Sequence, residues 1–134
     1  MIIKKIIAFG ALLVTFGSCK EKLPFQPDYE IGSGIIIGRE NCSSVPSKNA
    51  WLIQLIRPSA GGRTFGDDIT YNNIKYSNVI KTYNIPDTSK IAEKTYVFEF
   101  YLEPDQISLQ CDIQNPKVFD ILTVRINNFS GVKL

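Results

Sequence analysis

The sequence predicts an all-β domain, either a small barrel or a β-sandwich, after an N-terminal export signal. Most of the chain after residue 31 alternates apolar and polar residues with a period of two, the repeat of a half-buried strand. Gly, Pro and Asn residues divide this alternation into about six short segments, and none of them shows a convincing helical period. Short strands separated by turns are typical of small barrels and sandwiches.

The expected strands of the first half are rich in β-branched and aromatic residues and are bounded by turn residues. They cover residues 35–37, 50–57, 69–71 and 74–76. The second is apolar on both sides, which indicates a central strand. Asn72 and Asn73 separate the last two, and Asn tolerates positive φ, so this pattern predicts a hairpin. A long loop is expected over residues 58–68, either an extended segment or one helical turn over 77–83, and a short helix over 88–93.

The second half contains the clearest strand pattern. Residues 94–103 alternate strictly, and their large apolar residues share one face: Tyr96, Phe98, Phe100 and Leu102. Residues 106–112 predict another strand. A long final strand is expected over residues 117–128, with four residues facing inward: Val118, Leu122, Val124 and Ile126.

The first 18 residues have the pattern of a bacterial signal peptide. Lys4 and Lys5 precede an uncharged run over residues 6–16, which is shorter than the roughly 20 residues that span a bilayer. Gly17 and Ser18 then precede Cys19, an ending that resembles a lipobox. This resemblance implies cleavage before Cys19 and attachment of diacylglycerol and palmitate-type chains to it. Plain secretion and an uncleaved anchor are the alternatives.

The predicted organisation is a signal peptide over residues 1–18, a lipid-anchored tether over 19–31 and one domain over 32–134. Lys20 follows Cys19, where Asp would resemble an inner-membrane retention signal, so we expect anchoring in the outer membrane. Removal of Lys4 and Lys5 from the 15 basic residues leaves 13, equal to the 13 acidic ones. A neutral mature chain gives no support for nucleic-acid binding.

Cys42 and Cys111 are the two cysteines that remain beside Cys19. In an oxidising envelope they predict a disulfide, which would close a loop of about 70 residues and stabilise the domain by about 4 kcal/mol in the chain-entropy model. Two separate thiols and metal ligation are the alternatives, and the absence of histidine disfavours a metal.

Several short motifs resemble small envelope lipoproteins of the NigD-like group. They are Gly34-Ile-Ile-Ile with Cys42, Trp51-Leu-Ile-Gln-Leu, the segment from Tyr76 to Pro86 with its Asn-Ile-Pro turn, Lys94-Thr-Tyr-Val-Phe-Glu-Phe and Cys111. The resemblance covers about residues 34–126 and implies a compact OB-like Greek-key β-barrel. It implies no catalytic residue and no cofactor, because the group has no settled activity.

Catalytic patterns are scarce in the chain. Without histidine, Ser–His and Cys–His mechanisms and histidine metal sites are excluded. Asp67 and Asp68 could ligate calcium only with further oxygens, and a solvated loop is the simpler interpretation. In the alternation of the final strand, Asp120 falls on the same inward side as Val118 and Leu122. It is therefore either a buried carboxylate paired with Arg57 or Arg125, or a residue at a rim or bulge.

Tyr71, Tyr76 and Tyr83 could form an aromatic face that stacks a glycan or contacts a peptide, or could simply pack against the domain. The expected function is a non-enzymatic, membrane-tethered module for binding or assembly in the cell envelope. A glycan or an envelope protein is the expected partner. A small carboxylate-based glycan hydrolase, or a hydrolase inhibitor, is the alternative.

Overall fold

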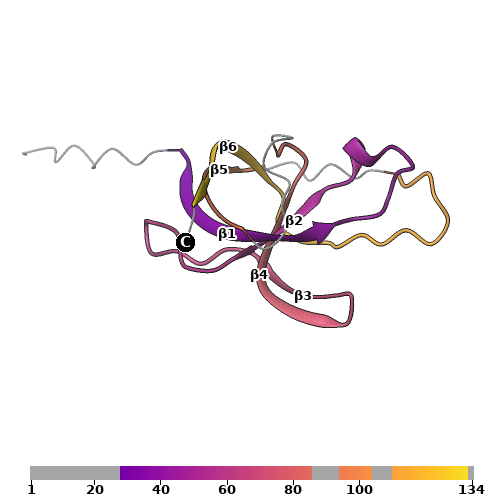
Figure 1. The fold of residues 1–134 in the computed structure, drawn as a ribbon, viewed down its shortest axis with the longest axis horizontal. Helices are drawn as coiled ribbons and strands as arrows, with labels where there is room; N and C mark the ends of the chain where they lie inside the picture. The colour runs from indigo at the N-terminus through magenta and orange to yellow at the C-terminus, as the bar shows by residue number, and fades with distance from the viewer. Residues whose placement is uncertain (1–27, 86–93, 104–109, 133–134) are drawn as a thin grey trace, which may run out of the picture.

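A computed structural model of the protein describes residues 28–85, 94–103 and 110–132 (Figure 1). It confirms the all-β class. Six strands form one antiparallel sheet in the order β3-β4-β2-β1-β5-β6, and the sheet is not closed into a barrel. The strands are β1 (Glu30–Arg39), β2 (Trp51–Leu55), β3 (Asp67–Tyr71), β4 (Ile74–Thr82), β5 (Thr95–Leu102) and β6 (Val124–Val132). Within the described ranges the helical content is one 3-10 turn, η1 (Pro46–Lys48).

Strand β1 is the shared centre of the sheet. Its first half pairs with β5 and its second half with β2, so both partners meet near Gly34. A Cβ atom at Gly34 would lie 2.7 Å from the backbone oxygen of Gln54, so the close approach requires glycine. A register shift between Ile36 and Gly38 marks a bulge, which increases local twist. The sheet consequently curls, and β5 and β6 curve above β1 in Figure 1.

The curl brings the β4 and β6 regions of the sheet together at a seam. Lys81 forms a parallel bridge with Thr123, and the Lys81 backbone N–H donates to the Leu122 carbonyl at 2.9 Å. The Asn84 carboxamide donates to the Ile126 carbonyl at 2.8 Å and accepts from its N–H at 3.0 Å. These few contacts link the two regions without a continuous ladder, so the sheet stays open there.

The main core fills the concave face of the sheet. Its buried members come from β1, β2, β4, β5 and β6 and from the residues just after β4: Ile36, Ile53, Leu55, Ile80, Ile85, Tyr96, Phe98, Phe100, Val124 and Ile126. The alternation expected in β5 is confirmed, since Tyr96, Phe98 and Phe100 are all buried. Leu102, at the end of β5, is 44% exposed and does not continue the pattern.

A second, smaller core lies on the opposite face of β2 and β4. It consists of Leu52, Ile69, Val79 and Ile121. Leu52 and Ile53 are neighbours on β2 and therefore point to opposite faces, yet both are buried. The expected central position of β2 is thus confirmed. The covering elements are the β3–β4 hairpin and the segment over residues 117–122, which we call the strap.

The strap corrects the prediction for the final strand. Strand β6 begins at Val124, and residues 117–123 form only isolated bridges, so a strand over 117–128 is wrong. Val118, expected inward, is 49% exposed. The alternation holds for Leu122, Val124 and Ile126, which all pack on the main core. It fails before Leu122 because the strap does not run as a strand of the sheet there, so Asp120 is exposed like Val118.

The structure also tests the predictions for the hairpin, for residues 77–83 and for the tether. The hairpin at Asn72 and Asn73 is confirmed, with φ values of 49° and 64°. The ambiguous residues 77–83 are mostly extended, as part of β4, and β1 begins at Glu30, inside the range expected for the tether. Residues 110–112 are not in a strand. The expected helix over 88–93 and residues 106–109 lie outside the described residues.

The predicted disulfide is confirmed. Cys42 and Cys111 are bonded, with their Cα atoms 4.6 Å apart. The bond joins the β1–β2 loop to the segment that leads into the strap. Asp112 reinforces the junction, because its carboxylate accepts hydrogen bonds from the Ser44 N–H at 2.7 Å and the Ser43 hydroxyl at 3.0 Å.

Candidate functional site

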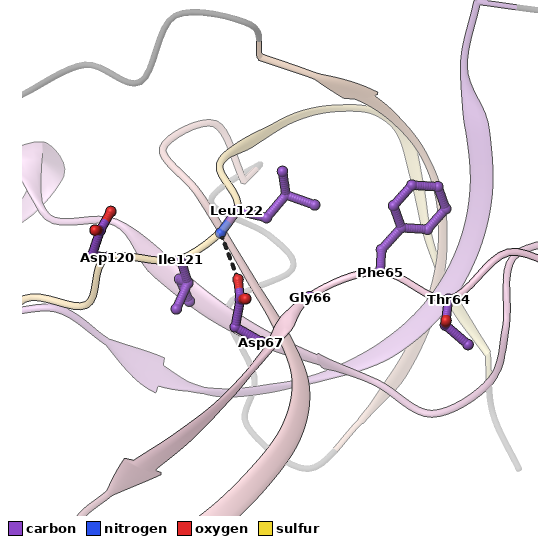
Figure 2. A pocket seen from close by; sticks show the side chains of 7 residues that line it. All are labelled: Thr64, Phe65, Gly66, Asp67, Asp120, Ile121 and Leu122. Atoms are coloured by element: carbon purple, nitrogen blue, oxygen red, sulfur yellow. Dashed lines mark hydrogen bonds between the residues drawn. The ribbon is translucent and has the colours of Figure 1, made fainter.

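An open groove lies at the seam where the curled sheet fails to close (Figure 2). Its volume is about 460 Å³, within the range of small-molecule and peptide-side-chain sites. Two short segments line it, one leading into β3 and one in the strap: Thr64, Phe65, Gly66 and Asp67, and Asp120, Ile121 and Leu122. The groove is therefore built from residues that lie far apart in the sequence.

Gly66 and Asp67 hold the two walls in place. Gly66 has φ +91°, and a Cβ atom there would lie 2.5 Å from the carbonyl carbon of Asn78, so the chain lies directly against β4. Asp67 pairs with Val79 on β4, and its Oδ2 accepts a hydrogen bond from the Leu122 N–H at 3.1 Å. Figure 2 shows this bond crossing between the walls. Asp67 consequently links the walls through its side chain.

The two ends of the groove differ in chemistry. Phe65 and Leu122 are half-buried and pack against the main core, and Phe65 meets Phe100 edge-on with ring centroids 5.3 Å apart. Asp67 and Asp120 are exposed. In Figure 2 Asp120 lies at one end and Phe65 at the other, with Asp67 between them. The groove thus has an acidic end and an apolar end.

Asp120 is a rim residue and not a buried carboxylate. It is exposed, because the strap is not the inward-facing strand that its parity suggested. Within the described residues neither Arg57 nor Arg125 pairs with it. Arg125 instead lies 3.8 Å from Glu103 and 5.2 Å from the ring centroid of Tyr101. The proposed partners of a buried Asp120 are therefore wrong, and its position at a rim is confirmed.

The three candidate tyrosines do not line this groove. Tyr71 and Tyr76 share one face of the hairpin and pack against the second core. Tyr71 also lies 6.2 Å from Phe119, and its hydroxyl donates to the Arg39 carbonyl at 3.4 Å. Tyr83 follows β4, where burial and the negative charge of Glu40 raise its pKa. The structure brings Tyr71 and Tyr76 together, and all three rings are half-buried.

A buried ion pair supports the strap from below, and the sequence interpretation missed it. Glu40 is 2% exposed and lies 3.1 Å from the Lys81 ammonium. Glu40 also accepts from the Phe119 N–H at 2.8 Å, and Lys81 donates to the Phe119 carbonyl at 2.7 Å. The pair therefore holds both polar groups of one strap residue next to Asp120. The only sequence signal was Lys81, which stands in the segment over residues 77–83 at a position where strand alternation predicts an apolar side chain.

Metal ligands do not gather around the groove. Among the residues that the structure describes, no group of three or more Cys, Asp or Glu side chains is placed to hold a metal ion. Asp67 and Asp68 lie next to each other at the start of β3, and the Asp67 side chain is directed to Leu122. The calcium interpretation therefore has no ligand set in this part of the chain.

Two further acidic side chains, on β5 and just after it, are engaged elsewhere. Glu99 accepts a hydrogen bond from the Asn128 carboxamide at 2.7 Å, and Glu103 pairs with Arg125. Neither lines the groove. Of the described carboxylates, only Asp67 and Asp120 belong to its walls.

Comparisons of the chain with protein-family models, with curated proteins and with solved structures found no match. A search of the described ranges for a helix long and apolar enough to cross a membrane found none.

Proposed function

We propose that this protein is a lipid-anchored, non-enzymatic binding module of the bacterial cell envelope. The observation that carries the proposal is the Cys42–Cys111 disulfide. It accounts for two of the three cysteines, so Cys19, which follows the lipobox-like ending, is the one left for lipid attachment. Structural disulfides are also typical of exported proteins, because the cytosol keeps thiols reduced.

The proposed domain type is an open, OB-like barrel. The OB fold is a partly open Greek-key barrel of five strands. Five of the strands here follow a compatible path: β1 pairs with β2 and β5, β2 with β4, and β5 with β6. The parallel bridge from Lys81 to Thr123 lies where a fifth pairing would close the barrel. In this proposal β3 is an additional edge strand, and the NigD-like motifs support the same arrangement.

The groove at the seam is the proposed binding surface. The strap wall is supported by the Glu40–Lys81 pair below it and by the disulfide before it, and the other wall by the pairing of Asp67 with β4. A site supported in this way can bind with little loss of conformational entropy. The acidic and apolar ends provide two kinds of contact for one ligand.

Fractionation of cells that express the full chain tests the anchor. We expect the wild-type protein in the membrane fraction and labelled by an alkyne fatty acid, because two or three acyl chains give stable anchoring. Cys19→Ser should abolish the label and release the protein. A Cys42→Ser/Cys111→Ser variant is the matched control and should keep the label. Labelling that survives Cys19→Ser would refute the proposal.

A carboxylate-based hydrolase is the second candidate, since Asp67 and Asp120 line one groove. Retaining and inverting glycosidases both use two carboxyl groups about 5–10 Å apart. Turnover assays on a panel of glycans distinguish the candidates. Activity that is lost in both Asp67→Asn and Asp120→Asn would favour the hydrolase over the binding module.

A further inference from the structure

We propose that the seam groove binds an extended peptide segment that presents a basic side chain and an apolar side chain on the same face. This inference rests on the proposed binding function and names its ligand class. Its support comes from the charge of the rim, from the order of the lining residues along the groove, and from the backbone of the wall before β3.

The groove rim carries two carboxylates without a cationic partner in the part of the chain that the structure describes. They are Asp67 and Asp120, and neither forms an ion pair with another described residue. In contrast to these exposed carboxylates, most of the buried or half-buried acidic groups among the described residues have basic partners: Glu30 with Arg63, Glu40 with Lys81 and Glu103 with Arg125. Charge complementarity therefore favours a cationic ligand group at this end.

The order of the lining residues sets the order of the two groups in the ligand. Asp120 and Asp67 precede Phe65 along the groove in Figure 2, and Leu122 lies on the side facing Phe65. In an extended peptide, residues i and i+2 point to the same face about 6.5 Å apart. A lysine at one of these positions would approach the carboxylates, while a leucine at the other would cover Phe65 and Leu122.

The wall before β3 can also contact a peptide backbone. No hydrogen bond among the described residues involves the backbone of Thr64 or Phe65, whereas the next residues pair with β4 from Asp67 on. Peptides commonly bind by adding a strand to an exposed sheet edge, and Thr64 and Phe65 lead directly into β3, which is an edge strand of this sheet. A neutral glycan would leave the rim charges without a partner, and Tyr71 and Tyr76, which could stack sugar rings, pack on the second core.

An NMR titration of the chain from residue 19 on, with Cys19→Ser to omit the lipid, tests the proposal. The probe is the blocked pentapeptide Lys-Thr-Leu-Thr-Lys. We expect saturable shifts of the amide signals of Thr64, Phe65, Gly66, Ile121 and Leu122. Asp120→Asn should weaken binding about two- to fivefold, as expected for one exposed charge contact. Asp28→Asn, an exposed acid outside the groove, should leave the affinity unchanged.

Two further probes make the test decisive. The peptide Glu-Thr-Leu-Thr-Glu should bind at least tenfold more weakly, and a neutral glucose hexasaccharide should not shift the groove signals. Equal binding of the Glu peptide, shifts caused by the hexasaccharide alone, or no groove shift with the Lys peptide would each overturn the proposal. Because Asp120 has no described partner, Asp120→Lys should fold and abolish binding, and retained binding would also overturn it. None of these outcomes affects the lipidation test at Cys19.

Discussion

The buried Glu40–Lys81 pair makes the sharpest prediction about stability. Glu40 is 2% exposed and the Lys81 side chain 13% exposed, and both bind the backbone of Phe119. Removal of one partner of a buried pair costs about 3–5 kcal/mol, because the other charge stays buried without compensation. We take the lower value, about 3 kcal/mol, for Glu40→Ala, because the Lys81 side chain is partly exposed. The lost acceptor for the Phe119 N–H adds about 1 kcal/mol, so Glu40→Ala should cost about 4 kcal/mol.

A double variant separates the charge effect from the packing effect. Glu40→Gln keeps an acceptor for the Phe119 N–H, and Lys81→Met keeps most of the lysine's apolar length. The Glu40→Gln/Lys81→Met protein therefore buries no charge, and it should lose about 1 kcal/mol, less than the sum of its single substitutions. Lys75→Met, on the exposed face of the hairpin, is the control and should change stability by less than about 0.5 kcal/mol.

Urea unfolding followed by the fluorescence of Trp51, the single tryptophan, measures these free energies. A cost below about 1 kcal/mol for Glu40→Ala, or a cost of the double variant equal to the sum of the single ones, would contradict this prediction. Either result would mean that the pair does not hold the strap in solution.

Three further predictions concern the groove wall, the disulfide and acid sensitivity. Gly66→Ala should lower the free energy of unfolding by about 3 kcal/mol, because φ is +91° and the added Cβ would collide with β4. Gly62→Ala is the control, since φ is +78° but the space around it is open, and it should cost only about 1 kcal/mol. Thermal unfolding compares the two variants. Cys42→Ser/Cys111→Ser should lose about 4 kcal/mol in urea unfolding, and unchanged stability would contradict the entropic argument. Burial by itself raises the pKa of Glu30, but hydrogen bonds and the charge of its paired arginine outweigh this and lower it below the ordinary 4.5. The stability that ionised Glu30 contributes is therefore complete above about pH 4.5 and is lost as the pH falls through the lowered pKa. Glu30→Gln should consequently reduce the loss of stability between pH 7 and pH 3 in urea unfolding. An unchanged loss would contradict this prediction.

Local patterns in the sequence predicted those parts of the fold that depend on neighbouring residues. The Asn72-Asn73 turn was predictable because both residues tolerate positive φ, and β5 because its large side chains alternate without interruption. Strand β2 was recognisable as central because it is apolar on both faces, and the structure buries both faces under separate cores.

The seam and its groove depend on contacts between distant segments. The strap resembles a strand in sequence, but it forms only isolated bridges, so the alternation that holds from Leu122 into β6 misplaced Asp120 and Val118. The partners Glu40 and Lys81 are 41 positions apart, and no local pattern marks them as a pair. Asp67 was noted only for its neighbour Asp68, although its observed role is to bind the Leu122 N–H across the groove.

Mass spectrometry of the protein extracted from bacterial membranes tests the proposed lipid anchor directly. We expect a mature chain that begins at Cys19, with the mass of a diacylglycerol-type lipid on its thiol and the Cys42–Cys111 disulfide intact. A chain that begins at another residue, or an unmodified Cys19 thiol, would contradict the proposed lipid anchor.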